Sequence, residues 1–157
     1  MDLKKYIRSI PDYPKKGILF RDITTLIKDK DAFRNCVDQM SKIIDKMNYD
    51  KIAGIESRGF IFSSPLAYNL SKPNILMRKK DKLPAEKHSI DPKEKIIVID
   101  DLIATGGTAE AAAKLVEKSG GEIAGFIFVI NLFDLPGKKL LEKKGYKVFS
   151  IMDFPGH

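Results

Sequence analysis

Four consecutive apolar residues at 96–99, Ile-Ile-Val-Ile, constrain the fold of this chain more than any other feature. All four are β-branched, and such residues favour strands. An apolar run without polar alternation is typical of a strand that is covered on both faces, as in parallel sheets. Parallel strands need crossover connections, which are usually helices. The run therefore predicts an α/β fold.

The rest of the chain alternates between short apolar runs and segments with helical periodicity. One central, mostly parallel sheet flanked by helices is therefore expected, in a single domain spanning 1–157. Pro65 is expected early in its helix, since proline is tolerated only in the first turn. The expected strands cover 52–55, 74–77, 96–99, 123–130 and 147–151, and the expected helices cover 31–47, 60–70, 108–119 and 138–144.

Ligands of open parallel sheets bind at the carboxyl ends of the strands, which directs attention to the residues after Ile99. Asp100 and Asp101 come next, and their carboxylates can accept hydrogen bonds from ribose hydroxyls or hold a hydrated Mg²⁺. Thr105-Gly106-Gly107-Thr108 then leads into a helix, whose unpaired N–H groups can bind phosphate. This combination predicts a site for a phosphorylated sugar.

Purely structural interpretations of this loop also stay open. Two glycines between a strand and a helix often form only a turn, and paired aspartates often only cap the next segment. The loop is neither the Walker phosphate loop, since no Gly-Lys-Ser/Thr comes after it, nor the Gly-x-Gly-x-x-Gly dinucleotide fingerprint.

Residues 98–108 resemble the phosphoribosyl-diphosphate motif of the type I phosphoribosyltransferases: apolar residues, two acids, then Ala-Thr-Gly-Gly-Thr. The resemblance implies that Asp100 and Asp101 are catalytic, hold the ribose hydroxyls, offset positive charge on the sugar and hold Mg²⁺ through water and substrate. It also implies that five residues bind the 5′-phosphate: Ala104, Thr105, Gly106, Gly107 and Thr108.

Residues 54–60 resemble the diphosphate loop of the adenine phosphoribosyltransferases within that family. The guanidinium of Arg58 can bind two phosphate oxygens at once, so Arg58 is expected to be catalytic and Ser57 to contact substrate. The alternative is a surface arginine paired with Glu56.

Residues 10–24 resemble the N-terminal signature of the same group, which implies that about 1–30 form a hood over the base. Phe20 would stack on or flank adenine, and the backbone at Leu19 and Arg21 would read the purine edge. The alternative is a structural arm with a phenylalanine in the core. Leu132 falls where the family places a residue against the base, although it also suits plain core.

Residues 77–86 resemble the family's Arg-Lys-x-x-Lys-Leu-Pro segment, which implies that Lys79 and Lys82 contact the diphosphate; a solvated lysine cluster is the alternative. The family's flexible lid, with its Tyr and Glu, is missing between Glu86 and Lys87. Two explanations are open. Either a lid segment has been left out of the sequence, which we favour because such a loop is the most mobile element, or the protein was built or evolved without one.

The resemblance implies a purine-salvage transferase that converts adenine and 5-phosphoribosyl 1-diphosphate into AMP and diphosphate, acts as a homodimer and uses Mg²⁺. No run is long enough for a membrane span, no signal peptide is evident and Cys36 is the single cysteine, so a cytoplasmic protein without membrane partners is expected. The net charge of +7 permits nucleic-acid binding, but no such motif is present and none is expected. Three other functions stay open: transfer to another purine base, a sensor that binds nucleic acid, and a nucleotide-binding module without turnover.

Overall fold

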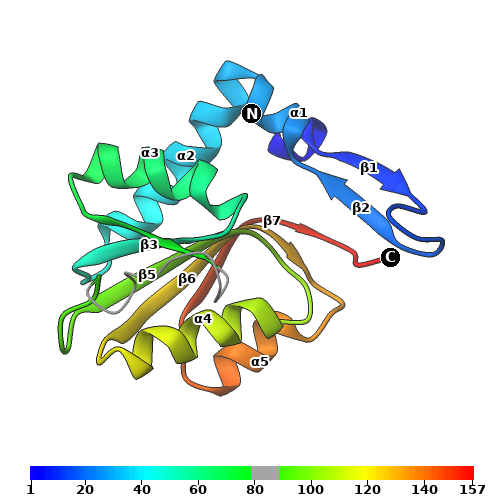
Figure 1. The fold of residues 1–157 in the computed structure, drawn as a ribbon. Coiled ribbons are helices and arrows are strands. Elements are labelled where there is room, and N and C mark those ends of the chain that lie inside the picture. Colours follow the sequence, from blue (N-terminus) through cyan, green and yellow to red (C-terminus); the bar gives the residue numbers. More distant parts are fainter. Residues whose placement is uncertain (79–88) are drawn as a thin grey trace.

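The computed structural model describes residues 1–78 and 89–157, which form a five-stranded parallel sheet (Figure 1). The strand order is β4-β3-β5-β6-β7, and every neighbouring pair is parallel. The predicted α/β fold with a parallel sheet is thus confirmed. The strands are β3 (Lys51–Ile55), β4 (Asn74–Met77), β5 (Lys95–Ile103), β6 (Glu122–Leu132) and β7 (Val148–Phe154).

Helices cover both faces of the sheet: α2 (Lys30–Asp45) and α3 (Gly59–Leu70) lie on one side, and α4 (Gly107–Lys118) and α5 (Gly137–Lys143) on the other (Figure 1). Strand β5 supplies alternate residues to two cores, Ile97 and Ile99 beneath α2 and α3, and Ile96 and Val98 beneath α4. All four side chains are fully buried, which explains the unbroken apolar run. No helix in the described part of the chain could cross a bilayer.

Two details differ from the sequence-based expectations. Strand β5 continues to Ile103, so the acid pair lies within the strand and not after it. Pro65 is the seventh of the twelve residues of α3, so its expected place early in the helix is wrong. Proline has no N–H to offer the carbonyl of Ile61, but the fully buried Phe62 and Leu66 hold the helix in place through this point.

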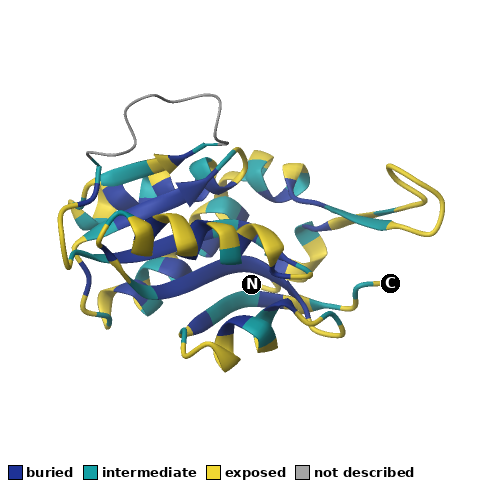
Figure 2. Cartoon of the chain, turned by 60° about the horizontal axis from the view of Figure 1, so that its bottom comes forward, coloured by how far each residue is buried: buried dark blue, intermediate teal, exposed yellow. Residues whose placement is uncertain are grey.

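The N-terminal part forms a short arm that projects from the sheet (Figure 1). A 3₁₀ helix (Leu3–Tyr6) precedes an antiparallel hairpin of β1 (Arg8–Pro11) and β2 (Leu19–Asp22), and α1 (Thr24–Lys28) returns the chain to the core. Within the hairpin, Arg8 and the buried Asp22 form a salt bridge of 2.6 Å. The tip of the hairpin is exposed, while the central strands of the sheet are mostly dark blue in Figure 2. Each strand has only four residues, too few for its periodicity to predict it.

Close approach of α3 to β3 depends on Gly54. A Cβ atom at this position would lie 2.2 Å from Ser63 Oγ and 2.8 Å from Ser63 Cβ. We expect Gly54→Ala to lower the free energy of unfolding by about 1–3 kcal/mol through overpacking. Ser63→Gly removes both of these atoms, so the double variant should lose less stability than the two single variants together. Urea unfolding of the four proteins measures this coupling, and strictly additive losses would contradict it.

Candidate active site

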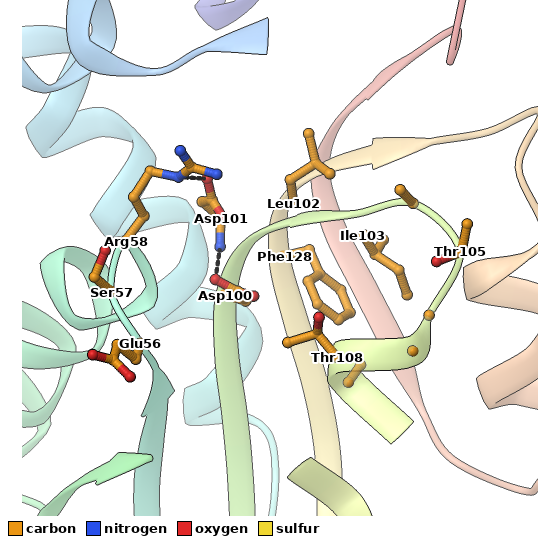
Figure 3. Close-up of a pocket in the computed structure, with 14 residues that line it drawn as sticks. Glu56, Ser57, Arg58, Asp100, Asp101, Leu102, Ile103, Thr105, Thr108 and Phe128 are labelled. Carbon is orange, nitrogen blue, oxygen red and sulfur yellow. Dashed lines mark hydrogen bonds and ion pairs between the residues drawn. The ribbon is translucent and has the colours of Figure 1, made fainter. Parts of the chain in front are cut away.

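A cavity of about 440 Å³ opens where β3 and β5 end at the carboxyl edge of the sheet (Figure 3). It therefore lies where the parallel topology predicts ligand binding. Three stretches line it: 56–58 after β3, 100–109 from β5 into α4, and Phe128 from β6. Of the predicted site residues, the cavity brings together Ser57, Arg58, Asp100, Asp101, Ala104, Thr105, Gly106, Gly107 and Thr108.

Arg58 and Asp101 form an ion pair across the cavity. Arg58 Nε donates to Asp101 Oδ2 at 2.6 Å, and the two side chains are 51% and 8% exposed. Glu56 instead lies 3.5 Å from an amino group of Arg78. The alternative of an Arg58–Glu56 surface pair is therefore wrong, because the backbone turns Arg58 toward β5. The guanidinium keeps an exposed edge that can still receive an anion.

Asp100 and Asp101 place two carboxyl groups side by side at this edge. The Asp101 backbone N–H donates to Asp100 Oδ1 at 2.8 Å. Burial, followed by the neighbouring Asp101 carboxylate, raises the pKa of Asp100 to about 8. The free protein therefore holds a proton on this pair at neutral pH, and a cationic ligand would favour its release.

The segment from Ala104 to Gly107 turns the chain from β5 into α4. Gly106 has a φ of +90°, a conformation that glycine adopts without steric cost. No side chain caps the N-terminus of α4, so the first N–H groups of the helix are left for a ligand. The exposed Thr105 and Thr108 add hydroxyl groups at the same place. This arrangement suits a phosphate group.

Gly137, at the start of α5, supports this turn and was not expected from the sequence. Its N–H donates to the carbonyl oxygen of Ala104 at 2.9 Å. A Cβ atom here would lie 2.5 Å from that oxygen and 2.9 Å from the Gly106 nitrogen. Only glycine fits this contact. The Pro136-Gly137 pair was a turn signal, but nothing in the sequence connected it with the loop 33 residues earlier.

The structure places the remaining predicted site residues at the margin of the cavity or away from it. Leu19, Phe20 and Arg21 lie on β2, and the Phe20 ring centroid is 5.8 Å from the Arg58 guanidinium. Leu132 ends β6 and is 7% exposed within the core beneath α2 and α3. Lys79 and Lys82 lie outside the described residues, as does the junction between Glu86 and Lys87.

Few side chains in the described residues could coordinate a metal ion at this site. Within 1–78 and 89–157, no group of three or more His, Cys, Asp or Glu side chains could hold an ion. Asp100 and Asp101 offer hard carboxylate oxygens, which suit Mg²⁺ when waters and a phosphorylated substrate supply its other ligands.

Comparisons with known proteins agree with this geometry. The family described as phosphoribosyl transferase domain matches residues 24–156. An adenine phosphoribosyltransferase of Pelagibacter ubique is 60% identical, with all of both chains covered. That alignment spans 175 positions against the 157 residues here, so the relative carries residues that this chain lacks.

Two solved structures share the fold. An adenine phosphoribosyltransferase of Thermoanaerobacter pseudethanolicus superposes with a TM-score of 0.93 at 41% identity, covering 98% of each chain. The Saccharomyces cerevisiae enzyme, complexed with adenine and an imino-altritol bisphosphate, gives 0.85 at 32% identity, covering 96% of each chain.

The raised pKa of Asp100 predicts a pH dependence of stability. The folded protein holds this proton more tightly than the unfolded chain, whose carboxyl has its ordinary pKa of 3.8. The contribution of Asp100 to the free energy of unfolding is therefore greatest at low pH. It falls as the pH rises from about 4 to about 8, and it is constant above that. Asp100→Asn lacks this titration, so its free energy of unfolding should rise relative to the unsubstituted protein across that window. Urea unfolding at several pH values measures the difference, and a constant difference would contradict the raised pKa.

Proposed function

We propose that the residues lining this cavity transfer a phosphoribosyl group to adenine, because the chain belongs to the adenine phosphoribosyltransferases. The reaction joins adenine to the sugar of 5-phosphoribosyl 1-diphosphate and gives AMP and diphosphate, a step of purine salvage. The observation that carries the assignment is the meeting of an uncapped helix N-terminus, two carboxyl groups and an arginine in one cavity.

In this proposal the loop from Ala104 to Thr108 binds the 5′-phosphate of the sugar. The uncapped N–H groups of α4 and the hydroxyls of Thr105 and Thr108 donate hydrogen bonds to the phosphate oxygens. The contact of Gly137 with Ala104 holds the loop in a fixed shape before the substrate arrives. Such preorganisation lowers the cost of binding and of reaching the transition state.

Asp100 and Asp101 then accept hydrogen bonds from the ribose hydroxyls. As diphosphate leaves C1 of the ribose, positive charge develops on the sugar, and nearby carboxylates stabilise it. Arg58 and Ser57 contact the leaving diphosphate. Because Arg58 pairs with Asp101 in the free protein, binding of diphosphate would exchange one anionic partner of the guanidinium for another.

Mg²⁺ would be held by Asp100 and Asp101 through water and substrate, and when bound it would neutralise negative charge on the diphosphate. Two adjacent carboxyl groups, one of which carries a proton in the free protein, suit a cation that arrives together with the substrate.

The N-terminal arm, about residues 1–30, would form the hood over adenine. The position of the Phe20 ring, 5.8 Å from Arg58, supports this assignment, because Arg58 in turn contacts Asp101. Stacking on Phe20 would hold the base, and backbone groups at Leu19 and Arg21 would select adenine, since an oxo-purine presents mismatched hydrogen-bonding groups. Leu132 would lie behind the base. The use of a phosphorylated substrate, 5-phosphoribosyl 1-diphosphate, also favours a cytoplasmic location for the protein.

Diphosphate release in the presence of Mg²⁺ and 5-phosphoribosyl 1-diphosphate tests the function directly. We expect release with adenine and none with hypoxanthine or guanine. Asp101→Asn should lower kcat on the order of 100-fold, the scale of losing one group that stabilises transition-state charge. Asp38→Asn, an exposed carboxylate on α2, is the matched control and should retain full activity. Release with an oxo-purine instead of adenine would overturn the assignment of the base.

We further propose a homodimer that forms through the outer side of α3 and the edge strand β4. Ile61 and Tyr68 lie two helical turns apart on α3 and are 36% and 86% exposed. Leu76 on β4 is 43% exposed. Neighbouring β4 residues pack into the core beneath α4, so Leu76 faces the α3 side of the sheet. Exposed apolar side chains on α3 lie beside β4, an edge strand that pairs with β3 alone among the described strands, and this combination favours burial against a second copy.

Light scattering should give a mass about twice the 17.7 kDa of one chain. Tyr68→Glu should shift the equilibrium toward monomer, because dimer formation would bury an unpaired charge. Lys42→Glu, an exposed charge change on α2, should not shift it. A monomer at every concentration of the unsubstituted protein would refute the dimer.

A further inference from the structure

Residues 155–157, the segment after β7, lie alongside the N-terminal hairpin, and Arg21 contacts both. In Figure 1 the end of this segment lies beside the hairpin. The guanidinium of Arg21 donates to the carbonyl oxygen of Pro155 at 2.7 Å and to Ser9 Oγ at 2.5 Å. It also lies 4.7 Å from the centroid of the Phe154 ring. One side chain of β2 therefore contacts both the opposite strand of the hairpin and the segment after β7.

Gly156 and His157 of the same segment contact Asp134, in the loop between β6 and α5. Asp134 Oδ1 accepts a hydrogen bond from the Gly156 N–H at 2.5 Å, and Asp134 Oδ2 lies 3.7 Å from His157 Nε2. A Cβ atom on Gly156 would lie 2.7 Å from Asp134 Oδ1 and 2.8 Å from Leu135 Cγ, so a larger residue would separate them. These contacts connect Arg21 to the main sheet, because the Phe133 N–H also donates to the Phe154 carbonyl oxygen at 3.0 Å.

The alternation of side chains along β2 relates these contacts to the site. Consecutive residues of a strand point to opposite faces. Arg21 contacts Ser9, its partner in the β1–β2 register, on one face. Phe20 lies on the other face, toward Arg58 and the cavity. Contacts that hold Arg21 on one face of β2 therefore also fix the position of Phe20 on the opposite face.

We propose that Arg21, Pro155–Gly156 and Asp134 form a tether that positions the hairpin over the adenine site, with the Arg21 side chain as a positioning residue for the base. The inference rests on the proposed role of residues 1–30 as the hood. Arginine suits this position because its planar fork reaches two acceptors at once, which a lysine ammonium on its flexible stem does not reproduce. Selective loss of adenine affinity follows from loosening the tether, because the acid pair and the loop from Ala104 to Thr108 lie on β5, on α4 and on the turn between them, and the Gly137 contact with Ala104 involves no residue of the tether.

Steady-state kinetics of two variants test the tether from its two ends. Arg21→Lys and Gly156→Ala should each raise KM for adenine about tenfold, equivalent to about 1.4 kcal/mol of binding. KM for 5-phosphoribosyl 1-diphosphate and kcat at saturating adenine should change by less than about twofold. Arg34→Lys, on the exposed side of α2, is the matched control for Arg21→Lys and should change neither constant. An unchanged KM for adenine in both variants, or an equal rise for both substrates, would overturn the proposal.

A readout that is independent of activity separates this inference from the proposed function. The chain has no tryptophan, and Tyr13 lies in the hairpin with its ring 5.2 Å from that of Phe20. In a Tyr13→Trp background, time-resolved fluorescence anisotropy should decay faster when Arg21→Lys or Gly156→Ala is added. An unchanged decay in both would refute the tether even in a fully active enzyme. If the unsubstituted protein formed no AMP, the proposed function would be refuted. The tether would then be tested by the anisotropy measurement alone.

Discussion

Two-sided burial of β5 is the constraint on which the other parts of the molecule depend. Its residues from Ile96 to Ile99 supply alternate side chains to the cores on the two faces of the sheet, and each of them is fully buried. Beyond Ile99 the same strand continues to Ile103 and so reaches the carboxyl edge of the sheet. Asp100 and Asp101 lie in this last part of the strand, so the element that organises the core also places the acid pair at the cavity.

Close backbone contacts then bring the other parts of the site to the same edge. A Cβ atom on Gly59 would lie 2.7 Å from the Ile99 carbonyl oxygen, so α3 can begin directly against β5 and place Arg58 beside Asp101. Gly137 performs the equivalent role for α5 and the turn from Ala104 to Gly107. In both cases a glycine permits the approach that a side chain would prevent. The site is therefore built where α3 and α5 contact β5 and the turn that follows it.

The charges of the site are arranged at some cost to the free protein. Burial and a like charge raise the pKa of Asp100, while Arg58 is shared between Asp101 and the Phe20 side of the cavity. Groups held in this way would gain partners from a phosphorylated ligand, and binding of that kind can favour a reaction. The N-terminal hairpin is organised differently, since it contacts the rest of the chain through a few side chains such as Arg21 and Phe20.

The α/β class, most of the elements from 30 onward, and the meeting of the acid pair with the Gly-Gly turn at one cavity were predictable from the sequence, because local periodicity, parallel topology and turn chemistry encode them. The two short strands of the hairpin, the extension of β5 beyond Ile99 and the pairing of Arg58 with Asp101 instead of Glu56 were not. These features depend on tertiary packing, as do the support from Gly137 and the contact between Arg21 and Pro155. The last two join residues far apart in the chain, 33 positions for Ala104 and Gly137 and 134 for Arg21 and Pro155, and no local pattern records such a distance.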